Sequence, residues 1–109
     1  MKRLHRLSGP FLKMALRAGR RIDAPLLRLI YRKNSALHGR FAFIIPKAVD
    51  KRSAARNRIR RRAREWVRVQ PRILAAPFDI AIFFDKKAAA APRRALKENL
   101  ETVFERLLA

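Results

Sequence analysis

The sequence contains no cysteine and only two histidines. A chain without cysteine forms no disulfide framework and no thiolate zinc site. The two histidines, His5 and His38, are isolated in the sequence and cannot form a metal cluster by themselves. Zinc-finger proteins are therefore excluded.

Long apolar runs are also absent. No run approaches the ~20 apolar residues of a membrane-spanning helix, and Lys13 and Arg17 interrupt the stretch that could pass for a signal-peptide core. These observations predict a cytoplasmic protein that does not act at a membrane. Residues 1–22 lack acidic side chains, however, and are rich in arginine and amphipathic, so a mitochondrial presequence is an alternative.

Acidic side chains are scarce, with 8 Asp and Glu against 28 Lys and Arg, which gives a formal net charge of +20. Such an excess indicates a polyanionic partner, either nucleic acid or an anionic membrane, and we favour nucleic acid. The excess is uneven, because residues 1–78 hold 22 basic and 3 acidic side chains, whereas residues 79–109 hold 6 and 5. The partner should therefore contact the first two thirds of the chain.

The chain has the length of one domain, residues 1–109, and its apolar spacing predicts an α+β fold. A first helix would follow Ser8 and end at Gly19, and a last helix would follow Pro92. Alternating apolar side chains predict strands in "PLLRLIYR", "RFAFII" and "FDIAIFF", with a short edge strand at residues 19–24. We expect the first two of these segments to form an antiparallel pair. The order α-β-β-β-α-β-α predicts two layers, in which helices cover one face of a mixed sheet.

The other face of this sheet is expected to stay partly open. A shallow, positively charged trough would be lined there by Arg28, Ile30, Arg32, Arg40, Ala42 and Ile44. The alternative is an ordinary solvated face over which the long side chains lie.

Between the last two strands stands "SAARNRIRRRAREWVR", residues 53–68, with seven arginines and one carboxylate. At helical spacing, the apolar side chains form a stripe of Ala55, Ile59, Ala63 and Trp66, with Val67 and Val69 at its margins. Burial of each larger side chain contributes roughly 1.5 to 3 kcal/mol. We expect the helix to begin at Asp50 or Ser53 and to end before Pro71, with Trp66 in the core.

On the opposite face of this helix the arginine side chains repel one another, because Arg60, Arg64 and Arg68 follow at four-residue steps. Each such step costs roughly 0.2 to 0.5 kcal/mol. Phosphate groups explain such a face better than solvent does, since guanidinium donates paired hydrogen bonds to oxyanions. Asn57 adds a neutral donor and acceptor suited to a sugar hydroxyl or a base edge.

The segment "ARNRIRRRARE" resembles the signature of the bacterial ribonuclease P protein component, in which a basic helix begins with an Arg-Asn-Arg triplet. "RFAFIIPK" and "FDIAIFF" are similar to the strands that flank this helix in the family, and "KRLHRL" to its basic start. The resemblance implies a left-handed crossover between two parallel strands. It also implies a monomeric protein subunit, bound one to one to a catalytic RNA, that helps remove the 5′ leader of precursor tRNA. The reaction would use Mg²⁺ held mainly by the RNA.

Carried over by residue, the resemblance implies two contact sets. The set for the RNA subunit comprises Lys47, Lys51, Arg52, Arg56, Asn57, Arg58, Arg60, Arg61, Arg64 and Arg68. The set for the leader comprises Phe11, Leu12, Leu16, Arg28, Ile30, Arg32, Arg40 and Ala42. The chain departs from the family in two places: leucines replace the phenylalanines that often line the first helix, and "PKA" retains one lysine of the usual pair.

No catalytic or metal-binding residue is predicted in the protein itself. Metal-assisted phosphodiester cleavage needs convergent carboxylates, but Asp79 and Asp85 stand at opposite ends of one strand. The remaining acids, Glu98, Glu101 and Glu105, follow the surface spacing of the last helix, and we expect all five to be lone surface acids. Two alternatives stay open: a structural, ribosomal-type RNA-binding protein without an enzymatic role, and a membrane-active basic protein.

Overall fold

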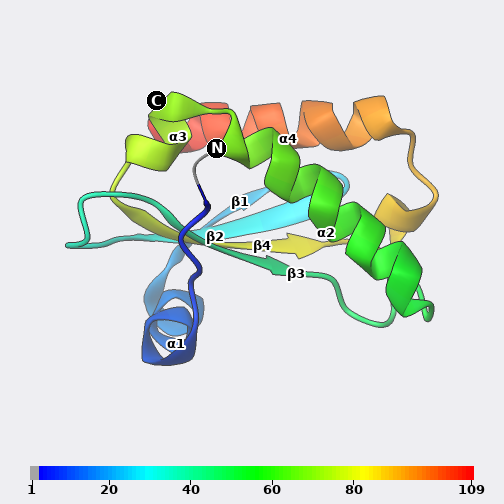
Figure 1. Cartoon of the computed structure of the whole chain (residues 1–109), viewed down its shortest axis with the longest axis horizontal. Coiled ribbons are helices and arrows are strands. Elements are labelled where there is room, and N and C mark those ends of the chain that lie inside the picture. Colours follow the sequence, from blue (N-terminus) through cyan, green and yellow to red (C-terminus); the bar gives the residue numbers. More distant parts are fainter. Residues whose placement is uncertain (1–2) are drawn as a thin grey trace.

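A computed structural model describes residues 3–109 of the chain. The elements follow one another as α1 (Gly9–Ala18), β1 (Arg20–Asp23), β2 (Leu27–Lys33), β3 (Arg40–Ile44), α2 (Ser53–Arg68), α3 (Pro71–Ala75), β4 (Phe78–Phe84), the 3₁₀ helix η1 (Lys86–Ala89) and α4 (Arg93–Leu108). Figure 1 shows their arrangement. The predicted α+β class and the order of its main elements are confirmed, whereas α3 and η1 were not predicted.

The sheet has the strand order β1-β2-β4-β3. β2 pairs antiparallel with both β1 and β4, and β3 pairs parallel with β4. The predicted antiparallel pairing of β2 with β3 is therefore wrong, because β4 lies between them. Ile80, Ala81 and Ile82 have no exposed surface, so β4 is apolar on both faces, as a central strand requires. Alternation in β2 and β3 shows which face each side chain takes but not which strand is its neighbour.

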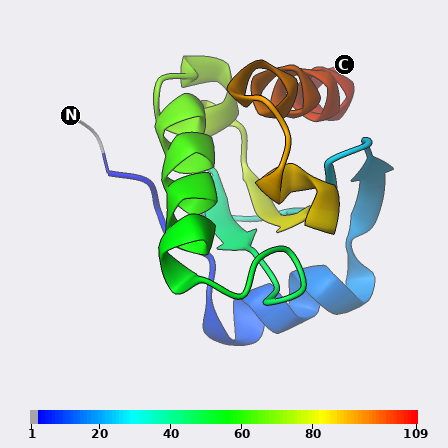
Figure 2. The same ribbon diagram turned by 90° about the vertical axis from the view of Figure 1, so that its right-hand side faces the viewer.

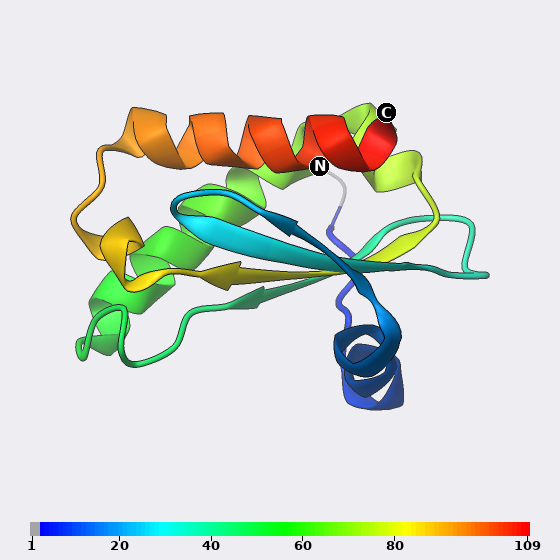
Figure 3. The ribbon, with the colours of Figure 1, turned by 180° about the vertical axis from the view of Figure 1, so that it is seen from behind.

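Helices lie on both faces of the sheet, as Figures 1 and 3 show. α2, α3 and α4 cover one face, and the main core lies between them and the sheet. Its members include Leu29, Ile82, Val103 and Phe104, which are at most 2% exposed. The expected cover on one face is thus correct for these helices, but α1 lies on the opposite face.

The connection from β3 through α2 to β4 is left-handed. The two strands run parallel, and α2 lies above them on the covered face (Figures 1 and 2). Seen from the side of α2 with the strands pointing upward, the chain passes from β3 on the right to β4 on the left. Nearly all such crossovers are right-handed, so the family resemblance predicted an exception that periodicity does not reveal.

The apolar stripe of α2 is centred slightly differently from the prediction. Ala63 and Val67 are fully buried, whereas Trp66 lies at the margin, with its ring centroid 5.7 Å from that of Phe104. Val69 is 67% exposed because the helix ends at Arg68, one residue earlier. Trp66 was predicted in the core; it is half-buried and packs against the core cluster. The placement of Val69 in the stripe is wrong.

Candidate nucleic-acid interface

α1 crosses the open face of the sheet and divides it. Strand pairing places three rows of side chains on this face: Arg28–Phe83–Ile44, then Ile30–Ala81–Ala42, then Arg32–Asp79–Arg40. The helix packs on the middle row, where Ala15 and Ala81 have no exposed surface and Ile30 is 7% exposed. The first and third rows therefore lie on opposite sides of α1.

Close contact with the sheet is possible because α1 presents its smallest side chains there. At the end of the helix, a Cβ on Gly19 would come within 2.8 Å of Ile30 Cγ2 and 2.9 Å of the Tyr31 carbonyl oxygen. Helical geometry then places Leu12 and Leu16 on one side of Ala15. Only a narrow strip of the predicted apolar face of α1 therefore contacts the sheet, and the side chains on both flanks of this strip are more exposed.

On the Leu12 side lies a cleft of about 920 Å³ between α1, the edge of β3 and α2. We call it the arginine cleft. Its cationic lining comprises Arg3, Arg6, Arg60, Arg64 and Arg68, and its remaining lining includes Leu12, Phe41, Ala42, Phe43 and Ile44. No acidic residue is among the described residues that line it. The arginine cleft therefore joins residues predicted for the leader to residues predicted for the RNA subunit.

The N-terminal segment supplies two of these arginines because it is attached to the free edge of β3. The Leu7 amide donates to the Phe41 carbonyl (2.8 Å), and the Phe41 amide donates to the His5 carbonyl (2.9 Å). The His5 and His38 rings stack with 3.8 Å between their centroids. Arg3 and Arg6 were not predicted as site residues, because an unpaired strand edge is not visible in a sequence.

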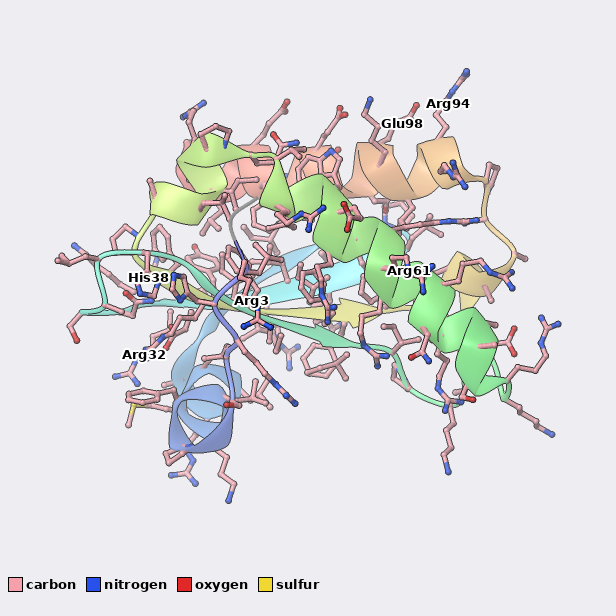
Figure 4. All side chains as sticks on the ribbon, in the orientation of Figure 1. Arg3, Arg32, His38, Arg61, Arg94 and Glu98 are labelled. Carbon is pink, nitrogen blue, oxygen red and sulfur yellow. The ribbon has the colours of Figure 1, made fainter. Side chains whose placement is uncertain are left out.

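The polar and basic residues in the first turns of α2 make different contacts. Arg56 is half-buried and donates to the carbonyls of Asp50 (2.9 Å) and Lys51 (3.1 Å), so it braces the turn before the helix. Asn57 accepts from Arg60 (2.6 Å), whereas Arg58 is exposed. In Figure 4, Arg61 projects from the exposed front of α2.

The loop before α2 carries the other predicted cations. Lys47, Lys51 and Arg52 are exposed. Arg52 donates side-chain and backbone hydrogen bonds to Asp50, and these bonds lower the pKa of Asp50 to about 2. Asp50 therefore remains ionised and orders the loop rather than capping α2, whose N-cap residue is Arg52.

Arg40 does not line an open trough, contrary to the prediction. Its guanidinium binds the Asp79 carboxylate with two hydrogen bonds, Nε to Oδ1 (2.7 Å) and Nη2 to Oδ2 (2.9 Å). Asn34 donates a third hydrogen bond to Asp79 Oδ1 (2.8 Å). Asp79 is only 5% exposed, so the expectation of a surface acid is wrong. A buried carboxylate requires such partners because desolvation penalises an unpaired charge.

Arg28 and Arg32, which were predicted to share one trough, lie on opposite sides of α1. Arg28 forms an exposed ion pair with Asp23 (2.7 Å), in a second hollow of about 590 Å³ that Leu16 and Phe83 also line. Arg32 is exposed in the third row (Figure 4). The prediction of a single trough failed because periodicity assigns residues to a face without locating the helix that crosses it.

Residues 3–109 contain no group of three or more His, Cys, Asp or Glu side chains that could hold a metal ion. Within the same residues, no helix is both long and apolar enough to cross a membrane.

A family model described as Ribonuclease P matches residues 1–108. The chain belongs to the ribonuclease P protein family. The ribonuclease P protein component of Klebsiella pneumoniae (strain 342) is 34% identical over 86 residues, which are 79% of this chain and 71% of that protein. That of Photorhabdus laumondii subsp. laumondii is 35% identical over the same length and coverage.

Solved structures share the fold of this chain. The RNase P protein of Staphylococcus aureus has a TM-score of 0.85 at 19% identity and covers 96% of both chains. That of Thermotoga maritima has a TM-score of 0.81 at 21% identity, over 96% of this chain and 97% of the other. Family membership makes the chain a protein subunit of the endoribonuclease of tRNA processing, with ribonuclease P RNA as its partner.

Proposed function

We propose that the chain binds the 5′ leader of precursor tRNA in the arginine cleft while the exposed basic residues of α2 bind the RNA subunit. The observation that carries this proposal is a cleft with five arginines, an apolar floor and no acidic side chain among its described lining residues. Guanidinium groups suit the phosphates of a single strand, and the apolar floor suits its sugars and bases. The protein would act as a monomer, one copy per RNA, in the cytoplasm.

The two binding surfaces share one helix. Arg60, Arg64 and Arg68 line the cleft, whereas Arg58 and Arg61 are exposed and do not line it. We therefore assign the first three to the leader and the last two, with Lys47, Lys51 and Arg52, to the RNA subunit. The family resemblance implied that Arg60, Arg64 and Arg68 bind the RNA subunit, and this assignment moves them to the leader set.

Leader recognition in the arginine cleft is expected to depend little on base identity. Leu12 lines the cleft and cannot stack on bases, and stacking on the half-buried Phe43, which also lines it, tolerates any base because every base has a π-face. The arginines contact phosphates, which are the same in every sequence. The cleft would thus recognise a single strand by charge and width.

Magnesium ions are assigned mainly to the RNA partner. The side chains of residues 3–109 do not form a group suited to holding them, since Asp79 is bound to Arg40 and Asp50 to Arg52. The protein's contribution would be affinity for the substrate and the choice of precursor over mature tRNA.

Reconstitution tests the proposal. The purified protein alone should leave precursor tRNA intact, and the protein with a ribonuclease P RNA should remove the leader in the presence of Mg²⁺. Binding should favour precursor over mature tRNA. Equal binding of the two tRNAs would support the structural, ribosomal-type alternative, and cleavage by RNA-free protein would overturn the assignment of chemistry to the RNA.

The residues of the Arg-Asn-Arg triplet should respond differently to substitution. Arg58→Ala should reduce the log-log salt slope of RNA-subunit binding by about 0.7 to 0.9, and leave stability unchanged to within about 0.5 kcal/mol. Arg56→Ala should also lower the free energy of unfolding by about 1 to 2 kcal/mol, because its hydrogen bonds to the Asp50 and Lys51 carbonyls are lost. Filter binding at several salt concentrations measures the salt slope, and urea unfolding measures the free energy of unfolding. Identical unfolding of the two variants would contradict the bracing role of Arg56.

A further inference from the structure

The N-terminal segment that lines the arginine cleft is fixed most firmly around Arg6. Arg6 pairs parallel with Phe41, and the backbone hydrogen bonds of its neighbours His5 and Leu7 to Phe41 enclose this pairing. Leu7 is only 2% exposed, so this part of the segment is also buried. Backbone pairing and burial therefore place Arg6 without any contribution from the His5 ring.

Arg3, the other arginine of the segment, is held differently. Within residues 3–109, no backbone hydrogen bond joins Arg3 or Leu4 to the sheet. Leu4 packs against the core, which restrains its position but not the direction of the chain beyond it. The His5 ring supplies the second point that this direction requires, because it stacks on the His38 ring with 3.8 Å between the centroids and 23° between the planes.

The His38 ring is a firm support because hydrogen bonds hold the turn that carries it. His38 lies between β2 and β3 (Figure 4). Its carbonyl accepts from the Asn34 side chain (3.1 Å), and its Nδ1 donates to the Gly39 carbonyl (3.1 Å). The Gly39 amide donates to the Leu74 carbonyl in α3 (2.9 Å). The exposed His5 ring thus lies on a platform that belongs to the folded domain.

The arginine cleft needs such a support because its two walls repel each other. Arg3 and Arg6 line one wall, and three arginines of α2 line the other, with no acidic residue among the described residues of the lining. Without an anion in the cleft, this repulsion drives a loosely held Arg3 outward. A contact that places Arg3 before RNA arrives lowers the cost of ordering it on binding.

We propose that His5 and His38 are positioning residues for Arg3, and that their stack holds its guanidinium in the arginine cleft to contact one phosphate of the leader. This inference rests on the proposed function, because it takes the leader as the occupant of the cleft. Arg6 contacts its own phosphate independently of the stack, since the backbone pairing with Phe41 already places it. The stack therefore determines whether this wall of the cleft offers one cation or two.

The two histidines do not form a metal site instead. Rings stacked at 23° direct their nitrogen lone pairs along nearly parallel planes, so the nitrogens do not converge on one ion. The Nδ1 of His38 is engaged by the Gly39 carbonyl. Within residues 3–109, no third His, Cys, Asp or Glu joins the pair to complete a ligand set.

The test is the salt dependence of precursor tRNA binding to the holoenzyme reconstituted with a ribonuclease P RNA. His5→Ala should lower the log-log salt slope by about 0.7 to 0.9, the value of one phosphate contact. His5→Phe should restore the slope, because a phenyl ring also stacks on His38. Both variants keep the His5 backbone carbonyl that accepts from Phe41, and urea unfolding should show that both remain folded.

Two double-mutant cycles separate positioning from the loss of an independent contact. Arg3→Ala should lower the slope by the same amount as His5→Ala, and combining the two should lower it no further. Arg6→Ala is the matched control, because its effect should add to that of His5→Ala and bring the total fall to about 1.4 to 1.8. Binding of mature tRNA should show none of these changes.

An unchanged slope for His5→Ala would overturn the inference, whether or not the variant is less stable, since the stack would then be a purely structural contact. Additive effects of His5→Ala and Arg3→Ala, equal coupling of His5 to Arg3 and Arg6, or no restoration by His5→Phe would also overturn it. Failure of the proposed function would appear in the wild type itself, which would then bind precursor and mature tRNA equally.

Discussion

Replacement of Asp79 by alanine is expected to lower the free energy of unfolding by about 3 to 5 kcal/mol. The Arg40 side chain is 19% exposed, and without Asp79 its charge would remain buried without a carboxylate partner. The Asn34 amide would also lose a hydrogen bond of 2.8 Å. Since small domains have a total stability of about 5 to 15 kcal/mol, urea unfolding should reveal a large shift in midpoint.

The exposed pair of Arg28 and Asp23 provides the matched control. Its side chains are 47% and 63% exposed, so Asp23→Ala should cost at most about 1 kcal/mol. Replacing both partners of the buried pair with apolar residues, Arg40→Met and Asp79→Leu, should recover most of the loss, because no unpaired charge remains. A loss for Asp79→Ala as small as that for Asp23→Ala would show that the buried pair contributes little.

This pair connects three parts of the molecule that surround the interface. Arg40 begins β3, Asp79 lies near the start of β4, and Asn34 also donates to the His38 carbonyl in the turn before β3. The His38 ring in turn stacks on His5 of the N-terminal segment. A defect at Asp79 is therefore expected to disturb the N-terminal wall of the arginine cleft as well as overall stability.

Much of the architecture is present in the sequence as local periodicity. In the last helix, the apolar side chains at helical spacing, including Leu100, Val103 and Phe104, are all buried in α4. The stripe from Ala55 to Ala63 is buried in α2 as expected. These positions could be predicted because one helical period determines which side chains share a face.

Features that depend on pairing between distant segments were not predictable in the same way. β4 lies between β2 and β3, and both of its faces are apolar. A run such as "FDIAIFF" shows that a strand is buried on both faces, but it does not show which strands pair with it. The burial of Asp79 depends on Arg40, which is 39 residues away in the sequence. Sequence spacing carries no signal for such a pair.

The division of the predicted trough is the most important difference for function. Arg28, Arg32 and Arg40 do share a face, as alternation indicates. Ala15 allows α1 to lie across the middle of that face, and the helix places the first arginine on one side and the other two on the opposite side. The cations that serve the leader are consequently expected from α2 and from the N-terminal segment.

Simultaneous replacement of Arg60, Arg64 and Arg68 by alanine is expected to weaken holoenzyme binding of precursor tRNA by about two orders of magnitude or more at moderate salt. All three side chains line the arginine cleft. Each phosphate contact contributes about 0.7 to 0.9 to the log-log salt slope, so the slope should fall by about 2 to 2.7. Mature tRNA, which has no leader, should bind with a much smaller change.

The control for this variant removes the same charge elsewhere. Arg72, Arg93 and Arg94 are exposed on α3 and α4 and do not line the arginine cleft, and Figure 4 shows Arg94 far from it. Their replacement by alanine should leave the salt slope for precursor tRNA nearly unchanged. If both triple variants lose affinity equally, net charge rather than the cleft governs binding. If the cleft variant weakens precursor and mature tRNA alike, its arginines hold the RNA subunit or the tRNA body, and the leader must lie elsewhere.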